Sequence, residues 1–105
     1  MRLYWSDVAA ADITDIHDYI ARDVPYYAER FVDRLIESTE KLLQHPKIGR
    51  CVPEADRDDI RELIMQGYRI IYLVADNNIQ ILTVIHGSRD LGNRDNQPWA
   101  DDATE

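Results

Sequence analysis

The stretch from residue 60 to residue 90, IRELIMQGYRIIYLVADNNIQILTVIHGSRD, decides the fold of this chain. Branched and aromatic apolar residues dominate three runs within it, at 60–65, 68–75 and 79–86, as is typical of strands. Gln66-Gly67 predicts a tight hairpin turn after the first run. Asp76-Asn77-Asn78 predicts a second turn, since Asn and Asp tolerate left-handed backbone angles. The stretch therefore predicts an antiparallel meander of three strands.

The second and third of these strands are apolar at nearly every position. Strands of this composition usually have both faces covered. We expect helices to cover one face of the sheet and the other face to be open for a partner.

Before the meander, apolar residues recur at helical spacing in two segments. Ser6 is expected to cap the first helix, and Asp7 would lie in its positively polarised first turn. The predicted buried face of this helix consists of Ala9, Ile13, Ile16 and Ile20. The predicted solvated face carries Asp12, Asp15 and Asp18.

The second helix is expected to begin at Pro25, which suits a first helical turn, with Asp23 or its neighbour as the cap. Its apolar positions are Ala28, Phe31, Val32, Leu35, Ile36, Thr39, Leu42 and Leu43. The connection between the helices is short, so they should form an antiparallel hairpin. A polar loop is expected from residue 45 to residue 59.

Residues 2–5 are short, aromatic and apolar, and they read as a strand before the first helix. The order of elements becomes β-α-α-β-β-β. This order predicts an α+β fold in which a helical hairpin packs on a small, mainly antiparallel sheet.

The length of 105 residues fits one domain, which we place at residues 1–91. Residues 92–105 lose hydrophobic periodicity and read as an acidic, flexible tail. The formal net charge is -8. This charge argues against general, phosphate-driven binding of nucleic acid.

Cys51 is the single cysteine, so no intramolecular disulfide can form, which suits a reducing cytosol. The chain shows no secretory signal and no apolar run long enough to span a bilayer, so we expect a cytoplasmic protein. The three histidines lack metal-ligand spacing, and there is no glycine-rich phosphate loop. Neither a metal nor a cofactor is predicted.

Four polar residues on the predicted sheet could carry chemistry: Arg61, Arg69, His86 and Arg89. The first two lie on adjacent strands and the last two at the end of the third strand, so they could converge at one edge. Arginines with a histidine bind phosphates and move a proton, as a ribonuclease needs.

A structural role is the alternative for the two strand arginines. In this interpretation Arg61 and Arg69 pair with Glu62, Asp59 or Asp76 on a solvated edge. The residues alone favour this alternative, because structural ion pairs are common.

Six segments share one order and spacing with a known family. They are Trp5-Ser-x-x-Ala9-x-x-Asp12-Ile-x-x-Ile16-x-x-Tyr19-Ile20, Pro25-x-x-Ala28-x-Arg30-Phe31, Leu42-x-x-x-Pro46-x-x-Gly49-Arg50, Arg61-Glu-Leu-Ile, Gly67-Tyr68-Arg69-Ile-Ile-Tyr72 and Val84-Ile85-His86-Gly-x-Arg89-Asp90. Together they cover about residues 4–91. Over that range the chain resembles the ParE branch of the ParE/RelE toxins of bacterial toxin–antitoxin pairs.

The resemblance implies the β-α-α-β-β-β fold and a complex with a cognate ParD-like antitoxin. Such antitoxins bind operator DNA through their N-terminal part and wrap the toxin with a C-terminal segment, so this chain would meet DNA only indirectly. Characterised ParE toxins poison DNA gyrase, whereas RelE toxins cut mRNA on the ribosome.

The composition favours the gyrase-directed branch. RelE-type nucleases tend to be basic and to carry lysines, arginines and a C-terminal tyrosine, whereas this chain has only Lys41 and Lys47 and no tyrosine after Tyr72. Two alternatives stay open. One is a ribosome-dependent nuclease that uses the four polar residues named above, and the other is a non-toxic member of the family that only binds its antitoxin.

For the antitoxin we expect a helix in an apolar groove beside the helical hairpin and an extended segment across the open sheet. The expected antitoxin-binding residues are Tyr19, Tyr27, Leu35, Tyr72 and Leu73.

Overall fold

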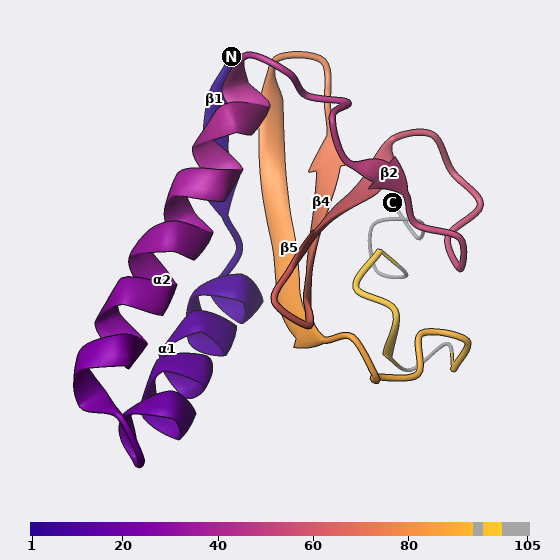
Figure 1. The fold of residues 1–105 in the computed structure, drawn as a ribbon. Coiled ribbons are helices and arrows are strands. Elements are labelled where there is room, and N and C mark those ends of the chain that lie inside the picture. The colour runs from indigo at the N-terminus through magenta and orange to yellow at the C-terminus, as the bar shows by residue number, and fades with distance from the viewer. Residues whose placement is uncertain (94–95, 100–105) are drawn as a thin grey trace.

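A computed structural model describes residues 1–93 and 96–99 of the chain. Figure 1 shows two helices lying together along one side of a twisted sheet. The elements are β1 (Arg2–Trp5), α1 (Asp7–Ala21), α2 (Pro25–Glu40), the 3₁₀ turn η1 (Lys41–Leu43), β2 (Arg50–Cys51), β3 (Ile60–Met65), β4 (Tyr68–Val74) and β5 (Asn78–His86). The α+β fold predicted from the sequence is confirmed.

The five strands form one sheet in the order β1-β5-β4-β3-β2. β1 pairs with β5 in parallel, and the other three pairs are antiparallel. The two-residue strand β2 falls within the expected polar loop, where no strand was predicted. It forms because Arg50 pairs with Glu62 of β3, a contact between residues far apart in the chain.

The meander forms as predicted, with strands that match the expected runs closely. Gln66 and Gly67 both have positive φ angles, of 48° and 88°. Two such angles in a two-residue loop define a type I′ turn, whose twist suits a hairpin. Gly67 supplies the second angle without a steric cost.

The first helix begins as predicted. The Ser6 hydroxyl accepts a hydrogen bond from the Ala9 N–H at 3.0 Å, as expected of an N-cap. Ala9 and Ile16 are buried, so the predicted apolar face is correct. The second helix has Pro25 in its first turn but no side-chain cap, because its N-cap is Val24 rather than Asp23.

One member of the predicted solvated face is placed differently. Asp12 is half-buried and accepts hydrogen bonds from the Thr83 hydroxyl and, at 3.0 Å, from the Val84 N–H. The prediction of a solvated Asp12 was therefore wrong. The helical period could not reveal the polar partner, because that partner lies on β5.

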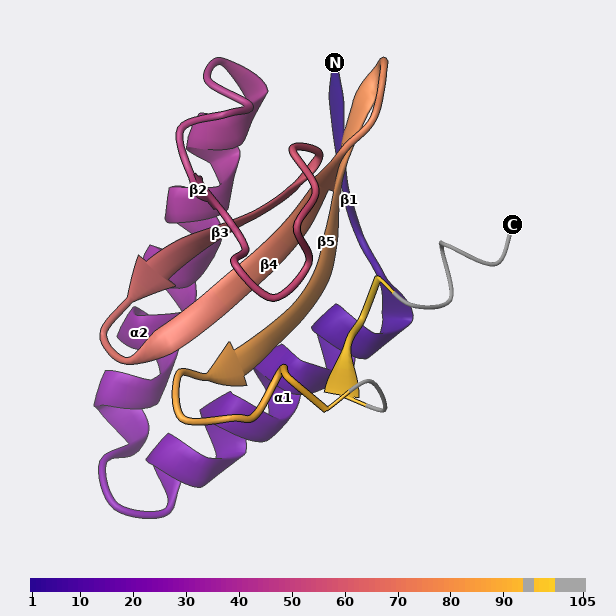
Figure 2. The ribbon, with the colours of Figure 1, turned by 90° about the vertical axis from the view of Figure 1, so that its right-hand side faces the viewer.

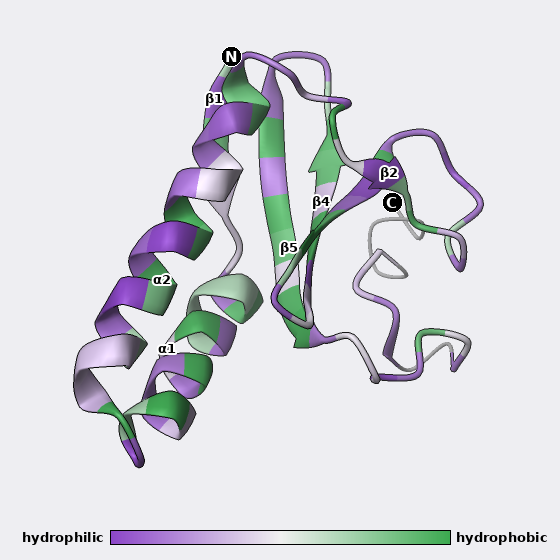
Figure 3. Cartoon of the chain, in the orientation of Figure 1, coloured by the Kyte–Doolittle hydropathy of each residue, from purple (hydrophilic) through white to green (hydrophobic). Residues whose placement is uncertain are grey.

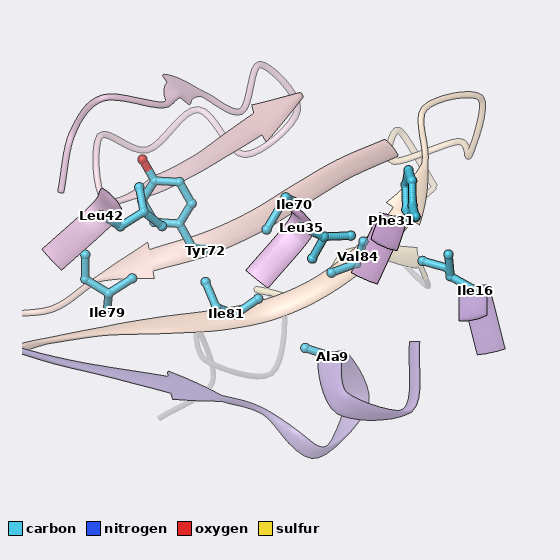
Figure 4. Packing of buried hydrophobic residues seen from close by; sticks show 10 residues of the cluster. All are labelled: Ala9, Ile16, Phe31, Leu35, Leu42, Ile70, Tyr72, Ile79, Ile81 and Val84. Carbon is cyan, nitrogen blue, oxygen red and sulfur yellow. The ribbon is translucent and has the colours of Figure 1, made fainter. Parts of the chain in front are cut away.

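Two apolar clusters lie on opposite faces of the sheet. The larger one, between the sheet and the helices, is drawn in Figure 4. Its buried members are Ala9, Ile16, Phe31, Leu35, Leu42, Ile70, Tyr72, Ile79, Ile81 and Val84.

The second cluster covers the face that was expected to be open. Its buried members are Val52, Ile60, Ile71, Leu73, Ile85, Leu91 and Trp99. That expectation was wrong over this cluster, because the chain covers the face with its own β2–β3 loop and with residues near its C-terminus. Figure 3 shows that this loop is mostly hydrophilic. Its contribution to the cluster is the buried Val52, with Ala55 packed against it.

Trp99 is 5% exposed, although it falls within the predicted tail. The rest of that prediction lies partly outside the described residues, at 94–95 and 100–105. Within the described residues, no helix is long and apolar enough to cross a membrane.

Candidate functional site

An ion network occupies the sheet face opposite the helices. The Glu62 carboxylate is 1% exposed and accepts hydrogen bonds from Arg50 Nε at 2.6 Å and from Arg69 Nε at 2.5 Å. The remaining Arg69 nitrogens donate to both oxygens of Glu54, at 2.9 and 3.1 Å. Arg69 thus holds two carboxylates with three hydrogen bonds.

The charges of this network stabilise one another. The hydrogen bond from Arg69 holds the pKa of the Glu54 carboxyl below its ordinary value. The hydrogen bond to Glu54, followed by that to Glu62, raises the pKa of Arg69 against the effect of burial. A buried guanidinium with this set of partners is a structural group rather than a free phosphate clamp. The predicted pairing of Arg69 with Glu62 is confirmed, but the pair is buried rather than on a solvated edge.

Arg61 is hydrogen-bonded to the segments that precede β3. Its guanidinium donates to the carbonyl oxygens of Lys47, Gly49 and Asp58, and to the Asp58 carboxylate at 2.7 Å. Lys47 also binds Asp58, at 2.9 Å. These hydrogen bonds, first from Lys47 and then from Arg61, lower the pKa of Asp58. The ion-pair interpretation of Arg61 is therefore correct in kind, but its partner is Asp58 rather than the acids named from sequence.

The four polar residues do not form one site. Arg61 lies opposite Tyr72, on the helix-facing side of the sheet, whereas Arg69 lies opposite Ile64 and Ile85, on the other side. Successive side chains along a strand alternate between the two faces. Tyr72 lies three positions from Arg69 on β4, so these two side chains, and with them Arg61 and Arg69, are on opposite faces. The predicted convergence of Arg61 with Arg69 was therefore wrong, because it took account of adjacent strands but not of the pleat.

His86 and Arg89 lie at the exposed end of β5. His86 Nδ1 is 2.7 Å from the Ser88 hydroxyl and accepts a hydrogen bond from the Ser88 N–H. The His86 ring packs edge-on against Tyr68, with ring centroids 5.6 Å apart. His86 is exposed and lies opposite Tyr68, the neighbour of Arg69 on β4. Its imidazole is therefore on the other face of the sheet from the buried network around Arg69.

A run of ring contacts joins α2 to this end of the sheet. Tyr27 packs on Phe31, Phe31 on Tyr68, and Tyr68 on His86. The Tyr27 hydroxyl donates to the side-chain oxygen of Gln66 in the β3–β4 turn, at 2.8 Å. These contacts hold the tip of the meander against the helix.

The expected antitoxin-binding residues divide into two groups. Tyr19 and Tyr27 are exposed, at 66% and 39%, on α1 and α2. Leu35 and Tyr72 are both 0% exposed, and Leu73 is also buried. Figure 4 shows Leu35 and Tyr72 inside the core. These three cannot be surface anchors of the free chain, and that part of the prediction is corrected.

The helical hairpin presents more apolar contact candidates than the two exposed tyrosines. Exposed apolar side chains on the two helices also include Val8, Tyr26 and Ile36. Helical periodicity places Val8 and Tyr26 outside the core face, which is the signal that could have found them. Ile36 belongs to the apolar positions expected for the second helix, but it is exposed.

A cleft lies at the opposite end of the sheet from His86. It has a volume of about 860 Å³, and its lining includes Met1, His45, Lys47, Asp58 and Asp76. The ion pair of Lys47 with Asp58 forms part of its wall. Over residues 1–93 and 96–99, no group of three His, Cys, Asp or Glu side chains is arranged to hold a metal ion.

Three comparisons place this geometry among known proteins. The family described as the ParE toxin of the type II toxin–antitoxin system parDE matches residues 3–91. Toxin RelE2 of Caulobacter vibrioides is 34% identical over 89 residues, which cover 84% of this chain and 97% of that protein. A solved structure titled as the chromosomal ParDE TA system from P. aeruginosa superposes with a TM-score of 0.71 at 27% identity, over 82% of this chain and 95% of that one.

Proposed function

This chain belongs to the ParE toxin family of type II toxin–antitoxin systems, and we propose that it acts by inhibiting DNA gyrase while a ParD-like antitoxin holds it inactive. The family membership carries the toxin–antitoxin part of this proposal. Gyrase is preferred to RNA as the target because of the positions of the residues that a nuclease would need.

The observation that favours gyrase is the placement of Arg61 and Arg69. Both guanidiniums are held by carboxylates or carbonyl oxygens, and they lie on opposite faces of the sheet. A phosphoryl-transfer site requires its charged groups to converge on one reacting phosphate. Within the described residues these two arginines do not converge.

The net charge of -8 supports the same choice. A ribosome-dependent nuclease must dock among RNA phosphates, and an acidic protein is repelled by them. A toxin that binds a protein target is free of this constraint.

A supercoiling assay with purified gyrase tests the target directly. We expect the free chain to inhibit supercoiling of a relaxed plasmid and the chain with bound antitoxin to have no effect. Unimpaired supercoiling at a large excess of the chain would refute gyrase as the target.

An mRNA nuclease is the second candidate, because His86 and Arg89 are exposed at the end of β5. Transcript integrity after induced expression without the antitoxin separates the two. Intact transcripts with arrested growth support gyrase. Cleaved transcripts that become intact in His86→Ala would establish the nuclease, and normal growth would establish a non-toxic antitoxin-binding member.

The antitoxin surface is proposed to lie on the outer side of the helical hairpin. Tyr19 and Tyr27 are its exposed aromatic residues from the predicted set. Truncating an aromatic anchor at a protein interface costs about 2 kcal/mol or more. Tyr19→Ala should therefore weaken antitoxin binding roughly 30-fold or more, while Ile48→Ala, an exposed apolar residue outside the hairpin, should leave it unchanged.

A further inference from the structure

The strand β1 lies at one border of the sheet. It pairs with β5 on one side, and over residues 1–93 and 96–99 no strand pairs with its other side. Figure 2 shows β1 as the outermost strand, next to β5. The opposite border is formed by β2, which has only two residues. With four residues, β1 is the longer of the two edge strands.

The backbone of β1 presents unpaired groups at this edge. The N–H groups of Arg2 and Ser6 donate to carbonyl oxygens within residues 77–81, at 3.2 and 3.0 Å. Backbone groups at alternate positions of a strand point to its two sides. The N–H and carbonyl groups of Leu3 and Trp5 therefore point away from β5. A row of such groups is a template for the addition of another strand.

The side chains of β1 do not protect the edge. Native sheets discourage added strands with proline, charged side chains or bulges at their edges. β1 reads Arg-Leu-Tyr-Trp, with one charge at its first residue and two aromatic residues, which favour strands. Leu3 and Trp5 pack against the core between the sheet and the helices. Tyr4, which is 48% exposed, therefore points to the other face.

The charges at the two ends of β1 are complementary under a two-fold rotation. Arg2 begins the strand, and Asp7 follows its last residue by two positions. Both side chains are exposed, and neither forms an ion pair within the described part of the chain. In an antiparallel pair of β1 strands centred on Tyr4, Arg2 of each copy lies one position away from facing Asp7 of the other. A second copy of this chain therefore offers each unpaired charge an opposite one.

The same register pairs the backbone groups. Leu3 of each copy faces Trp5 of the other, and these are the two residues whose backbone groups point to the edge. In an antiparallel pair, residues of this kind exchange both of their N–H···O hydrogen bonds. The two Tyr4 residues face each other at the centre, in a non-hydrogen-bonded pair, where side chains lie closest. One register thus satisfies the backbone, packs two aromatic rings and brings opposite charges together.

We propose that the free edge of β1 pairs with β1 of a second copy of this chain, so that the two sheets join into one about a two-fold axis at Tyr4. Such a contact uses the same surface of both copies and closes on itself. The strand is short, so the interface is small, and small interfaces give weak association. We expect a dimer that forms between micromolar and millimolar concentrations. The inference depends on neither the gyrase target nor the antitoxin.

Sedimentation equilibrium of the full-length chain over a range of concentrations measures this association. Leu3→Pro is the diagnostic variant, because proline removes the N–H that points to the edge and is tolerated in an edge strand. Leu3→Ala is its matched control, since it also loses the leucine side chain but keeps the N–H. We expect Leu3→Pro to remain monomeric at concentrations where the unaltered chain and Leu3→Ala are dimeric.

A second pair of variants leaves the backbone intact and keeps the proposal testable if circular dichroism shows that Leu3→Pro is unfolded. Tyr4→Lys and Tyr4→Glu each place like charges opposite each other at the two-fold axis, which should weaken association about two- to fivefold. A mixture of the two variants places opposite charges there. We expect the mixture to associate more strongly than either variant alone, because the predicted register brings residue 4 of one copy against residue 4 of the other.

Each outcome decides the proposal. Association that depends on the Leu3 N–H and is restored by mixing the charged Tyr4 variants supports it. A chain that stays monomeric up to millimolar concentration would overturn it, and so would a folded Leu3→Pro that dimerises as strongly as Leu3→Ala. A mixture that associates no better than its components would overturn the pairing at Tyr4.

A different occupant of the edge is also distinguishable. The unaltered chain would then stay monomeric, and the protein encoded beside its gene would bind Leu3→Ala but not a folded Leu3→Pro. This result would assign the edge of β1 to that protein and overturn the pairing of two copies.

Discussion

Asp12 on α1 accepts a hydrogen bond from the Val84 N–H on β5, across 72 positions of the sequence. The Thr83 hydroxyl binds the same carboxylate oxygen. This side chain joins the first helix to the sheet by polar bonds, in addition to the apolar contacts of Ala9 and Ile16.

Removing the Asp12 carboxylate should destabilise the fold. Asp12→Ala leaves a partly buried N–H and hydroxyl without their acceptor, which costs about 1–3 kcal/mol. Urea denaturation should show this loss in the free energy of unfolding. Asp15→Ala removes an exposed carboxylate from the same helix and should cost less than about 0.5 kcal/mol. Equal effects of the two substitutions would contradict the role given to Asp12.

Removing one partner of the buried pair of Glu62 and Arg69 should lower the free energy of unfolding more than Asp12→Ala does. Glu62→Ala leaves the guanidinium of Arg69, whose side chain is 8% exposed, without its most buried partner. Breaking one side of such a pair costs about 3–5 kcal/mol. Glu54→Ala removes the more exposed partner and should cost less, and the comparison of the two unfolding curves tests the assignment.

Tyr72 and Gly49 form a close contact that tolerates little change. The Gly49 N–H donates to the buried Tyr72 hydroxyl at 3.0 Å. A Cβ atom at residue 49 would lie 2.6 Å from that hydroxyl and 2.5 Å from the Glu62 carbonyl. Gly49→Ala should therefore destabilise the domain by about 1–3 kcal/mol through overpacking.

Tyr72→Phe tests the same contact from its other side. The substitution preserves the ring but leaves the Gly49 N–H unpaired, so we expect a loss of about 1–3 kcal/mol in the free energy of unfolding. Gly92→Ala is the matched control for the glycine, since its Cβ would meet only the flexible Asp90 side chain. A large effect at Gly92 would show that the Gly49 result is not specific to its packing.

Stability should fall in acid. The pKa of Glu54 is lowered from an ordinary value of 4.5 by its hydrogen bond from Arg69, and the pKa of Asp59 is lowered from 3.8 by that from Arg57. A carboxyl with a lowered pKa in the folded state contributes stability above its unfolded pKa, and this contribution is lost as the pH falls through the folded pKa. The urea midpoint should therefore decrease progressively below about pH 4.5, and Glu54→Gln should flatten the upper part of that decrease.

Stability should also fall in alkali, because the pKa of Tyr72 is raised rather than lowered. Burial raises the pKa of its hydroxyl above the ordinary value of 10.0. The neutral phenol is thus favoured by the folded state, and its contribution is lost as the pH rises from about 10 through the folded pKa. The urea midpoint of the unaltered chain should decrease above pH 10 more steeply than that of Tyr72→Phe, and parallel curves would contradict the assignment.

A substitution at the core is not a test of the antitoxin interface. Leu35→Asp with Tyr72→Asp, at two of the antitoxin-binding residues expected from the sequence, would place two charges in the core shown in Figure 4. The expected result is unfolding. Tyr19→Ala is informative instead, because that residue is exposed and its loss leaves the core intact.

Local pattern by itself determined both helices and every strand of this protein except β2. The Ser6 cap, the spacing of Ala9 and Ile16, and the Gln66-Gly67 turn act within a few residues, so the sequence displays each of them directly. The order of these elements, with the family motifs, was enough to indicate the α+β fold and the toxin family.

Only the tertiary structure decided which polar and aromatic side chains are free. Asp12 is bound by β5, Arg69 is held by Glu54 and Glu62, and Trp99 returns to a sheet that ends at residue 86. The faces that Arg61 and Arg69 occupy also follow from strand register. The physical reason is that burial and pairing depend on what lies across space, and a period of two or 3.6 residues carries no information about the partner.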